Sequence, residues 1–559
     1  MSNKTINLNI NGMTCSGCSS HIEKDLNGKD GIVNSTVNHE TGKGEFVYDT
    51  NKLSNQDVIN AVNNVGNYSV IEDIDKEDCC VKNAKDYDGK NKFDLIVIGG
   101  GSAAFSAAIK AESIGLTTLM VNDGLDFGGT CVNVGCVPSK NLIRAAETAY
   151  HATHSNFKGV KPKGVEIDFT QIIKDKKALV FTLQQHKYID VVSDFKNLTM
   201  LKGWAEFVDN KTILVDGKDT YTATNIIIAT GATTNIPNIE GLNKVGYLTN
   251  VSLFDLEEKP KSLTIMGAGY IGLEIAMAYN RLGVKVRIIE FTDRPLRSQT
   301  NDITDVLETQ MKSEGIEILP NFRAIKFEKD GDNTIIHCKC PDGSTTQIIE
   351  EGHIVVATGT KPNTSKLGLK NIDLKLTDKG HILVNEKMET NISNIYAAGD
   401  VANTPPFVYT AAKEGSTAVN NAFSLAKNSV DYTSLPWVVF TDPQIAGAGM
   451  DEVEAEKAGL PFEVSKLDLV HVPRALAAQD TRGFIKLIRN TETDKLIGAR
   501  VIAPEGGELI QQLSMAIKFG ITVKDLAESF YPYLTLSEGI KLAAITFGKD
   551  ISKLSCCAS

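Results

Sequence analysis

Two glycine-rich turns, each placed between an apolar strand and a helix, constrain the fold of this chain most strongly. The first spans residues 99–104 and follows the apolar run 94–98, and the second spans 267–272 and follows 262–266. The fingerprint positions are Gly99, Gly101 and Ala104 in the first turn and Gly267, Gly269 and Gly272 in the second. Such a turn lets the backbone approach a pyrophosphate at a helix N-terminus. The sequence therefore predicts two parallel-sheet units that each bind a dinucleotide.

Length and composition indicate an ordered protein of several domains. The chain has 559 residues, of which 42% are hydrophobic and 23% charged, and these values are typical of globular proteins. The net charge is −11, without a block rich in Lys or Arg, which disfavours nucleic acid and anionic membrane surfaces as partners. No apolar run approaches the ~20 residues of a membrane span, and the N-terminus lacks a secretory signal. We expect a cytoplasmic protein.

The residues that follow the two turns indicate how each bound nucleotide is recognised at its ribose. Glu290 ends the strand that follows the second turn, where a carboxylate accepts a hydrogen bond from a ribose 2′-hydroxyl and repels a 2′-phosphate. Arg294 and Arg297 follow it, and their positive charges can pair with a 2′-phosphate. Both NADH and NADPH are therefore candidate nucleotides for this site. For the first turn, Asn122 and Asp123 are equal candidates to contact the adenosine ribose.

The ten cysteines are arranged in pairs. Cys131 and Cys136 lie shortly after the first turn, in the glycine-rich segment 128–140. There they can form a disulfide that takes two electrons from a neighbouring cofactor. The other pairs are Cys15/Cys18, Cys79/Cys80, Cys338/Cys340 and Cys556/Cys557. Paired thiols in a reducing compartment indicate redox catalysis or soft-metal binding.

Segment 128–140 resembles the pyridine nucleotide–disulfide oxidoreductases, and the resemblance extends over about residues 93–550. It implies FAD at the first turn and NAD(P)H at the second. Residues 391–400 are predicted to form a strand that ends in Gly399 and Asp400. This segment resembles the second flavin motif of the family, in which the Asp contacts the ribityl chain. The FAD contacts implied by the resemblance are Gly99, Gly101, Ala104, Gly129, Thr130, Lys140, Gly231 and Asp400, and those to the nucleotide are Gly267, Gly269, Gly272 and Glu290.

The same resemblance assigns roles around the cysteine pair. Cys136 corresponds to the thiol next to the flavin, and Cys131 corresponds to the interchange thiol that faces the substrate. Lys140 and Glu274 correspond to a lysine and a glutamate that pair near the flavin ring.

The C-terminal region differs from that of disulfide-reducing relatives. Those enzymes carry a His-Pro-Thr segment that protonates the leaving thiol, whereas Tyr531 stands at the His position here. The chain instead ends with Cys556 and Cys557. This combination resembles the mercuric reductases within the family, and it implies that Hg(II) is the substrate. The resemblance further implies that Tyr188 and Tyr533 lie at the metal site.

The N-terminal residues 12–18 resemble the heavy-metal-associated domain motif. Cys15 and Cys18 stand at the start of a predicted helix, where both sulfurs converge on one ion and the helix dipole lowers their pKa. A thioredoxin-like redox motif shares this spacing, but Met13 and the predicted order of elements favour metal binding. The predicted elements are strand 6–10, helix 15–26, strands 32–38 and 44–48, helix 56–65 and strand 68–71.

Two cysteine pairs remain outside this assignment. Cys79 and Cys80 lie in a polar linker and either relay metal or have no role. Cys338 and Cys340 alternate onto one face of a predicted strand, with His337 on the other, so a packing role is expected.

The predicted protein is α/β: two Rossmann-like three-layer dinucleotide-binding domains and an α+β dimerisation domain follow a ferredoxin-like βαββαβ metal-binding domain. The expected division is 1–72 heavy-metal-associated domain, 73–92 flexible linker, 93–235 and 360–435 FAD-binding domain, 236–359 NAD(P)-binding domain and 436–559 dimerisation domain with the cysteine tail. The resemblance implies a homodimer in which the tail of one subunit delivers Hg(II) to the partner's cysteine pair.

Two other functions remain open. The first is a dihydrolipoyl dehydrogenase-like or other disulfide reductase with a fused metal-binding domain. The second is a non-catalytic soft-metal chaperone, which leaves both nucleotide sites unexplained.

Overall fold

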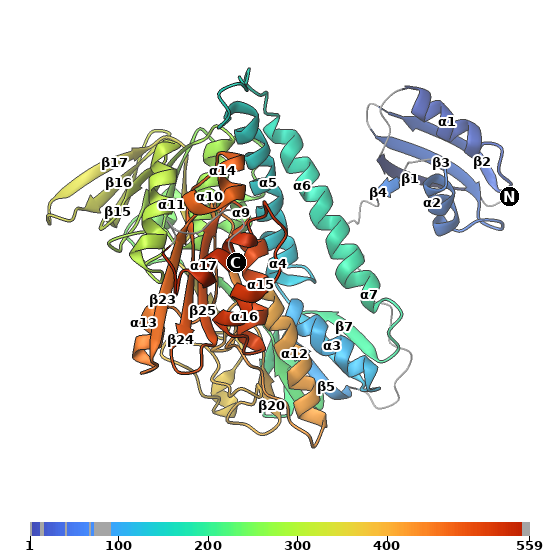
Figure 1. Ribbon diagram of the computed structural model, residues 1–559. Coiled ribbons are helices and arrows are strands. Elements are labelled where there is room, and N and C mark those ends of the chain that lie inside the picture. The colour runs from blue at the N-terminus through green and yellow to red at the C-terminus, as the bar shows by residue number, and fades with distance from the viewer. Residues whose placement is uncertain (1–2, 12–15, 40–41, 66–68, 72–90, 551–559) are drawn as a thin grey trace. The chain divides into compact units, whose positions relative to one another are not determined.

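The computed structural model describes residues 3–11, 16–39, 42–65, 69–71 and 91–550 (Figure 1). The chain divides into two compact units, Met1–Lys85 and Asp86–Ser559. Each unit has its own hydrophobic core.

The N-terminal unit has the predicted βαββαβ order. Its elements are β1 (Asn3–Asn11), α1 (Ser16–Leu26), β2 (Ile32–Asn38), β3 (Lys43–Asp49), α2 (Asn55–Asn63) and β4 (Ser69–Ile71). The strands form one sheet in the order β2-β3-β1-β4, and its core includes Phe46, Tyr48 and Ile22. Cys18 lies in the first turn of α1, and Cys15 lies outside the described residues.

The first dinucleotide unit is built on a seven-stranded sheet. Its strands are β5 (Lys92–Ile98), β6 (Thr118–Asn122), β7 (Leu198–Lys202), β8 (Ala205–Phe207), β9 (Thr212–Val215), β10 (Asp219–Ile228) and β20 (Ile395–Ala397). Their order is β7-β6-β5-β10-β9-β8, and β20 pairs with β10. Helix α3 (Ser102–Ser113) follows the first glycine turn, and α12 (Val408–Phe423) packs against it. The sheet thus joins segments from both halves of the body.

Two boundaries in this sheet differ from the expected ones. Strand β5 begins at Lys92, whose partner in β10 is Thr222, so the body starts before Phe93. Strand β20 covers only three residues of the segment 391–400, because the turn that carries Gly399 and Asp400 begins directly after it.

The second dinucleotide unit has the parallel order β14-β13-β12-β18. These strands are β12 (Ser262–Met266), β13 (Lys285–Ile289), β14 (Glu317–Leu319) and β18 (His353–Val356), with α10 (Tyr270–Arg281) after the glycine turn and α11 (Asn301–Ser313) after β13. A separate antiparallel sheet, β15 (Arg323–Asp330), β16 (Asn333–Lys339) and β17 (Thr345–Glu350), extends from this unit (Figure 1). The chain enters and leaves the unit through the antiparallel pair β11 (Ala232–Thr234) and β19 (Thr360–Pro362).

The C-terminal domain is a five-stranded antiparallel sheet covered by helices. Its strands are β21 (Trp437–Val439), β22 (Gln444–Gly449), β23 (Phe462–Asp468), β24 (Phe484–Asn490) and β25 (Leu496–Ala503), in the order β21-β22-β25-β24-β23. Its main helices are α15 (Gly506–Lys518), α16 (Val523–Glu528) and α17 (Glu538–Ile545). Among the residues that the structure describes, no helix has the length and apolar character of a membrane span.

Four helical segments carry the remaining site residues. They are α4 (Gly129–Val134), α5 (Cys136–Thr153), α6 (Phe169–Gln184) and the π-helical turn η1 (Gln185–Ile189). Helices α5 and α6 run side by side (Figure 1), and α5 also packs against α10 of the second unit. Cys136 therefore begins a helix that contacts both dinucleotide units, and Cys131 lies in the preceding helix α4.

Buried ion pairs join the second dinucleotide unit to the C-terminal domain. The Arg281 guanidinium lies 2.6 Å from a Glu314 carboxylate oxygen and 2.9 Å from one of Asp442, and these side chains are 1%, 3% and 9% exposed. Asp442 also pairs with Arg482 at 2.9 Å. Charges buried this deeply require partners, so this network fixes how the two domains pack.

Candidate active site

A large cavity brings ten of the predicted site residues together. It has a volume of about 880 Å³ and lies between the two dinucleotide units. The predicted residues that line it are Gly99, Gly101, Gly129, Thr130, Cys131, Cys136, Lys140, Gly231, Glu274 and Asp400. Ala104 is fully buried in α3 and is not among the described residues that line the cavity. The first glycine turn, the cysteine pair and the Gly399–Asp400 turn thus share one space.

The first glycine turn requires residues without a side chain. Gly99 has φ +130°, and a Cβ there would lie 2.2 Å from the Ala229 carbonyl oxygen. A Cβ on Gly129, which has φ +68°, would lie 2.5 Å from the Gly101 Cα. The backbone of α4 therefore lies against the turn at the edge of the cavity. This bare backbone beside a helix N-terminus fits the pyrophosphate of FAD.

The second glycine turn shows the three distinct glycine roles of a dinucleotide fingerprint. Gly267 has φ +104°, as the tight turn demands. A Cβ on Gly272 would lie 2.2 Å from the Gly267 carbonyl oxygen, so this glycine permits close packing of α10 on the turn. Gly269 faces open space, because a Cβ at this position would meet no atom within 4 Å. That opening fits the phosphates of a nicotinamide dinucleotide.

Glu290 lies at the end of β13, but protein donors already occupy its carboxylate. One oxygen accepts from the Ala268 backbone N–H at 2.6 Å, and the other accepts from the Thr292 N–H and hydroxyl, both at 2.7 Å. The guanidinium of Arg294 donates to the Gln299 carbonyl oxygen at 3.0 Å. Glu290 therefore holds the glycine turn as well as placing a negative charge beside it.

Asn122 and Asp123 both line the cavity, as expected for residues near the adenosine ribose. The Asn122 amide donates to the Leu125 carbonyl oxygen at 2.8 Å, and a Cβ on Gly100 would lie 2.5 Å from its Cγ. Asn122 is thus fixed against the turn, and the geometry leaves both residues as candidates.

The two cysteines that are predicted to be redox-active lie on consecutive helices. Cys131 belongs to α4, and Cys136 is the first residue of α5. Hydrogen bonding from the Cys131 thiol, together with the charge of Lys140, lowers the pKa of Cys136 to about 7, whereas the same interaction and burial raise the pKa of Cys131. At neutral pH a substantial fraction of Cys136 is therefore the thiolate, the reactive form, while Cys131 stays protonated.

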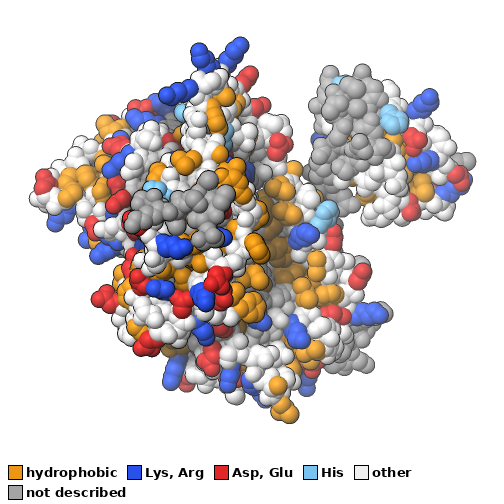
Figure 2. Space-filling view, in the orientation of Figure 1, with side chains coloured by type: hydrophobic (Ala, Val, Ile, Leu, Met, Phe, Trp, Pro, Cys, Tyr) orange, Lys and Arg blue, Asp and Glu red, His pale blue; other side chains and the backbone are white. Residues whose placement is uncertain are grey.

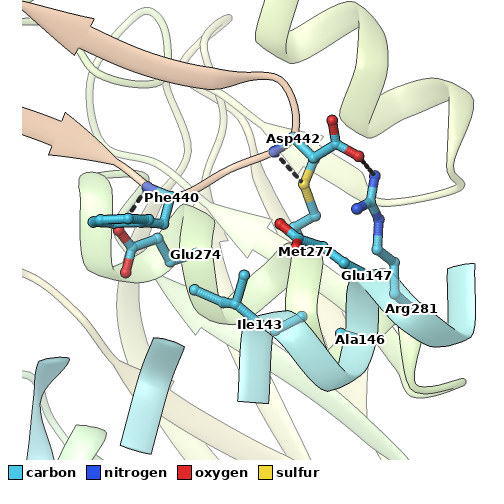
Figure 3. A pocket seen from close by; sticks show the side chains of 9 residues that line it. Ile143, Ala146, Glu147, Glu274, Met277, Arg281, Phe440 and Asp442 are labelled. Atoms are coloured by element: carbon cyan, nitrogen blue, oxygen red, sulfur yellow. Dashed lines mark hydrogen bonds and ion pairs between the residues drawn. The ribbon is translucent and has the colours of Figure 1, made fainter. Parts of the chain in front are cut away.

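Lys140 and Glu274 form the predicted pair. The Lys140 ammonium lies 2.8 Å from a Glu274 carboxylate oxygen, with side chains 33% and 6% exposed. The other Glu274 oxygen accepts from the Phe440 backbone N–H at 2.9 Å, as Figure 3 shows. The ion pair is therefore held by the C-terminal domain in addition to the two dinucleotide units.

The two predicted tyrosines have different surroundings. The Tyr188 hydroxyl lies 3.1 Å from the Ser102 hydroxyl, and its ring packs edge-on against Phe105. Burial raises the pKa of Tyr188, and the charges of the two cysteines raise it further. Tyr533 is 54% exposed, and neither Tyr188 nor Tyr533 is among the described residues that line the cavity.

Tyr270, a cavity residue that sequence reasoning missed, begins α10 inside the second fingerprint. Burial raises the pKa of its phenol, and the charges of Asp400, Glu274 and Cys136 raise it further. The sequence feature that could have identified Tyr270 is an aromatic residue at a position of the fingerprint that requires no particular side chain.

A second missed residue is Glu414, which is fully buried. It accepts from the Gly399 N–H at 2.7 Å and from the Tyr432 hydroxyl at 2.7 Å. Glu414 thereby holds the turn that carries Asp400.

The cysteines other than Cys131 and Cys136 lie outside the cavity or outside the described residues. Cys338 is fully buried in a hydrophobic cluster, and burial raises its pKa to about 11; a packing role fits this environment. His337 instead contacts Glu328 at 2.6 Å. Cys15, Cys79, Cys80, Cys556 and Cys557 lie outside the described residues.

Comparisons with known families match almost the whole chain. The family Pyridine nucleotide-disulphide oxidoreductase matches residues 93–415, its dimerisation domain matches 435–544, and the Heavy-metal-associated domain matches 7–69.

Similar proteins and structures agree with these matches. A mercuric reductase from Staphylococcus aureus is 38% identical over 100% of both chains, and one from Lysinibacillus sphaericus is 37% identical over 99% of both. Among solved structures, the Cu(II) complex of the HOCl-induced flavoprotein disulfide reductase RclA from Escherichia coli matches with a TM-score of 0.73 at 26% identity. It covers 82% of this chain and 100% of that one. The glycine turns, the cysteine pair and these full-length similarities together show that the chain belongs to the pyridine nucleotide–disulfide oxidoreductases and, within them, to the mercuric reductase family.

Proposed function

We propose that this protein reduces Hg(II) to elemental mercury with electrons from NAD(P)H, and so detoxifies mercury. The observation that carries the proposal is the placement of the Cys136 thiolate and Cys131 in one cavity with the first glycine turn and Asp400. Curated relatives named mercuric reductase match the chain over its full length.

FAD fits the cavity beside the dithiol. Bound there, FAD supplies a two-electron relay between the nicotinamide and the metal site. The turn around Gly99 and Gly101 would hold its pyrophosphate, and Asp400 would contact its ribityl chain. Lys140, fixed by Glu274, places a positive charge at the wall shared with Cys136.

The dithiol provides two sulfur ligands that suit a soft cation of low coordination number. Cys136 binds Hg(II) as the thiolate, and Cys131 loses its proton when its sulfur joins the metal. Two electrons then convert the ion to a neutral atom that thiolates no longer hold. The overall reaction is NAD(P)H plus Hg²⁺ giving NAD(P)⁺, H⁺ and elemental mercury.

The cysteine pairs outside the cavity are the proposed carriers of the metal. Cys15 and Cys18 would collect Hg(II), and Cys556 and Cys557 would pass it to the dithiol. Tyr188 and Tyr533 would assist by stripping ligands from the metal. We place this chemistry in the cytoplasm, where thiols stay reduced.

A homodimer would let the tail of one subunit serve the partner's cysteine pair. The dimerisation domain match over 435–544 supports this assembly. Several large apolar side chains of this domain are exposed in the single chain, namely Met515, Phe519, Phe530, Tyr533 and Leu534. Figure 2 shows hydrophobic side chains gathered in a hollow on the face that carries α15 and α16. A partner subunit would remove this apolar surface from water.

Disulfide reduction is the alternative supported by the similarity to RclA. It needs an acid–base group that protonates the leaving thiol, and Tyr531 stands at that position. Burial raises the pKa of Tyr531 above the usual tyrosine value, so near neutral pH its phenol is a much weaker acid than the histidine of the disulfide-reducing relatives.

The test compares NAD(P)H oxidation with Hg(II), Cu(II) and oxidised glutathione side by side. We expect turnover with Hg(II) and release of elemental mercury vapour. Faster turnover of oxidised glutathione, or Hg(II)-dependent oxidation without mercury vapour, would contradict the proposal.

Deleting residues 1–85 should leave an active catalytic body. The deletion follows the division between the two compact units and keeps β5, which begins at Lys92. The truncated protein should bind FAD and reduce Hg(II) bound to small thiols at a rate within about twofold of the full chain, because its cavity is complete without the N-terminal unit. Flavin content, subunit mass and Hg(II)-dependent NAD(P)H oxidation measure this. Loss of FAD or of the dimer would show that the N-terminal unit is structural.

Replacing Glu290 with glutamine should shift the preference from NADH toward NADPH. The amide oxygen can still accept from Ala268, while the negative charge that repels a 2′-phosphate disappears. Two unit charges about 4 Å apart in water interact by about 1 kcal/mol, so the NADPH-to-NADH ratio of kcat/KM should rise about fivefold or more. Glu317→Gln, on the neighbouring strand, changes the net charge equally and should leave the ratio unchanged. An unaltered ratio in Glu290→Gln would show that Glu290 does not face the ribose.

A further inference from the structure

An exposed aromatic ring and an arginine lie together just beyond the second glycine turn. Phe291 directly follows Glu290 and is 66% exposed. The Arg323 guanidinium, at the start of β15, lies 5.6 Å from the centre of the Phe291 ring. An aromatic face attracts a guanidinium without using its hydrogen-bond donors. The ring therefore holds Arg323 while leaving those donors able to bind an anion.

Backbone hydrogen bonds fix the start of β15 against the residues that follow β13. The Phe322 N–H donates to the Glu290 carbonyl oxygen at 3.0 Å, and the Asn321 N–H donates to the Thr292 carbonyl oxygen at 2.8 Å. The Glu290 carboxylate in turn accepts from the Ala268 N–H, inside the glycine turn, at 2.6 Å. The start of β15 is thus tied to the turn that would hold the pyrophosphate of a nicotinamide dinucleotide.

The positive charge of Arg323 has no acidic partner among the residues that the structure describes. Its cross-strand partner on the neighbouring strand β16 is Lys339 (Figure 1), which is also exposed and also lacks an ion pair with any described residue. Like charges directly opposite each other on a sheet repel. A bound anion would relieve this repulsion, so this end of the β15–β16 pair is a candidate anion site.

The two arginines that the sequence suggested for a 2′-phosphate interact with their own loop instead. Arg294 lies 3.4 Å from one Asp293 carboxylate oxygen and donates to the Gln299 carbonyl oxygen at 3.0 Å. Arg297 lies 3.6 Å from the other Asp293 oxygen. Asp293 partly neutralises both charges and would repel an incoming phosphate. Arg323 has no such neighbour among the described residues.

We propose that Arg323 is a nucleotide-specificity residue: its guanidinium, held over the Phe291 ring, binds the 2′-phosphate of NADPH. A dinucleotide with its pyrophosphate at the second glycine turn extends its adenosine ribose to the end of the following strand, which is β13, directly before Glu290 and Phe291. A guanidinium matches a phosphate through paired hydrogen bonds, and Lys339 adds a second cation opposite it. The inference deepens the proposed function, in which NAD(P)H is the electron donor.

The experiment measures nucleotide binding to the full-length, FAD-loaded protein by isothermal titration calorimetry, without Hg(II). The two probes are NADP⁺ and NAD⁺, which differ only in the 2′-phosphate and carry no hydride to transfer. Arg323→Gln removes the cation and should weaken NADP⁺ binding about tenfold relative to NAD⁺, because a charge-assisted contact to phosphate is lost. Arg323→Lys keeps the charge but not the fork, and it should lose about threefold.

Two further variants separate this contact from general effects of charge and packing. Phe291→Leu removes the ring that holds the guanidinium and should weaken NADP⁺ binding about threefold relative to NAD⁺. Lys326→Gln removes the same charge from the same strand, but its ammonium pairs with Glu328 at 2.7 Å. This matched control should leave the ratio of the two dissociation constants unchanged.

Three outcomes would overturn the inference: an unchanged ratio in Arg323→Gln, an equal loss of both nucleotides in that variant, or an equal change of the ratio in Lys326→Gln. An equal loss of both nucleotides in Phe291→Leu would overturn the role of the ring, since Phe291 would then contact the adenine. Wild-type protein that binds neither probe would show that the second turn holds no nicotinamide dinucleotide, and the proposed function would fail as well. Discrimination through Arg323 without Hg(II) turnover would support the inference and overturn the proposed function alone.

Discussion

Replacing Cys136 with alanine should abolish Hg(II)-dependent NAD(P)H oxidation while FAD stays bound. The substitution removes the thiolate that Lys140 stabilises and leaves the protonated Cys131 as the remaining sulfur of the pair. Loss of a group that acts as one unit with its partner costs on the order of 10³-fold or more in kcat. The glycine turn and Asp400 remain intact, so the flavin spectrum of the purified protein should persist.

The controls for this variant use the same cavity. Reduced wild-type enzyme should show the long-wavelength absorbance of a thiolate next to flavin, and Cys136→Ala should lack it. Cys338→Ala removes a thiol that is buried away from the cavity and should keep both the absorbance and turnover. Turnover near the wild-type rate in Cys136→Ala would show that the catalytic metal site lies elsewhere.

Replacing Arg281 with methionine should strongly destabilise the folded protein. It leaves the Glu314 carboxylate, 3% exposed, without the guanidinium 2.6 Å away. An uncompensated buried charge costs about 3–5 kcal/mol. We expect lower thermal and urea midpoints, with release of FAD at the transition. A midpoint within experimental error of wild type would contradict the buried network.

A double variant distinguishes the lost pair from lost packing. In Arg281→Met/Glu314→Leu both charges are gone, and Asp442 keeps its partner Arg482 at 2.9 Å. Replacing a whole buried pair with apolar groups is often neutral, so this protein should regain most of the lost stability. If the double variant is as unstable as Arg281→Met, packing around the guanidinium is the cause.

Local patterns were sufficient to predict the elements of the N-terminal unit and those around the two glycine turns of the body. In the N-terminal unit, alternating apolar residues predicted β2 at its observed bounds, Ile32–Asn38, because one face of each strand is buried. The glycine turns predicted the positions of α3 and α10, because the backbone geometry that the glycines permit acts within a few residues of each helix start. The short strand β20 was overestimated, since its length is set by pairing with β10 rather than by its own pattern.

Site residues could be predicted from the sequence only where they belong to a recognisable local motif. The ion pair of Lys140 and Glu274 was inferred through family resemblance and is present at 2.8 Å. The contribution of Phe440 was missed, because a backbone N–H donor has no sequence signal and lies far from Glu274 along the chain. The internal partners of Glu290 were also missed, since a backbone amide and a threonine leave the expected motif unchanged.

The pairing of β20 with β10 has a consequence for the order of folding during synthesis on the ribosome. Strand β10 ends at Ile228, whereas its parallel neighbour β20 begins only at Ile395. All strands of the second dinucleotide unit emerge in between, so that unit can complete its own sheet first. Domains generally fold as units while the chain grows. The sheet that carries the proposed FAD site, with Asp400 directly after β20, is therefore the later of the two to form, and we expect FAD to bind only after most of the chain has been translated.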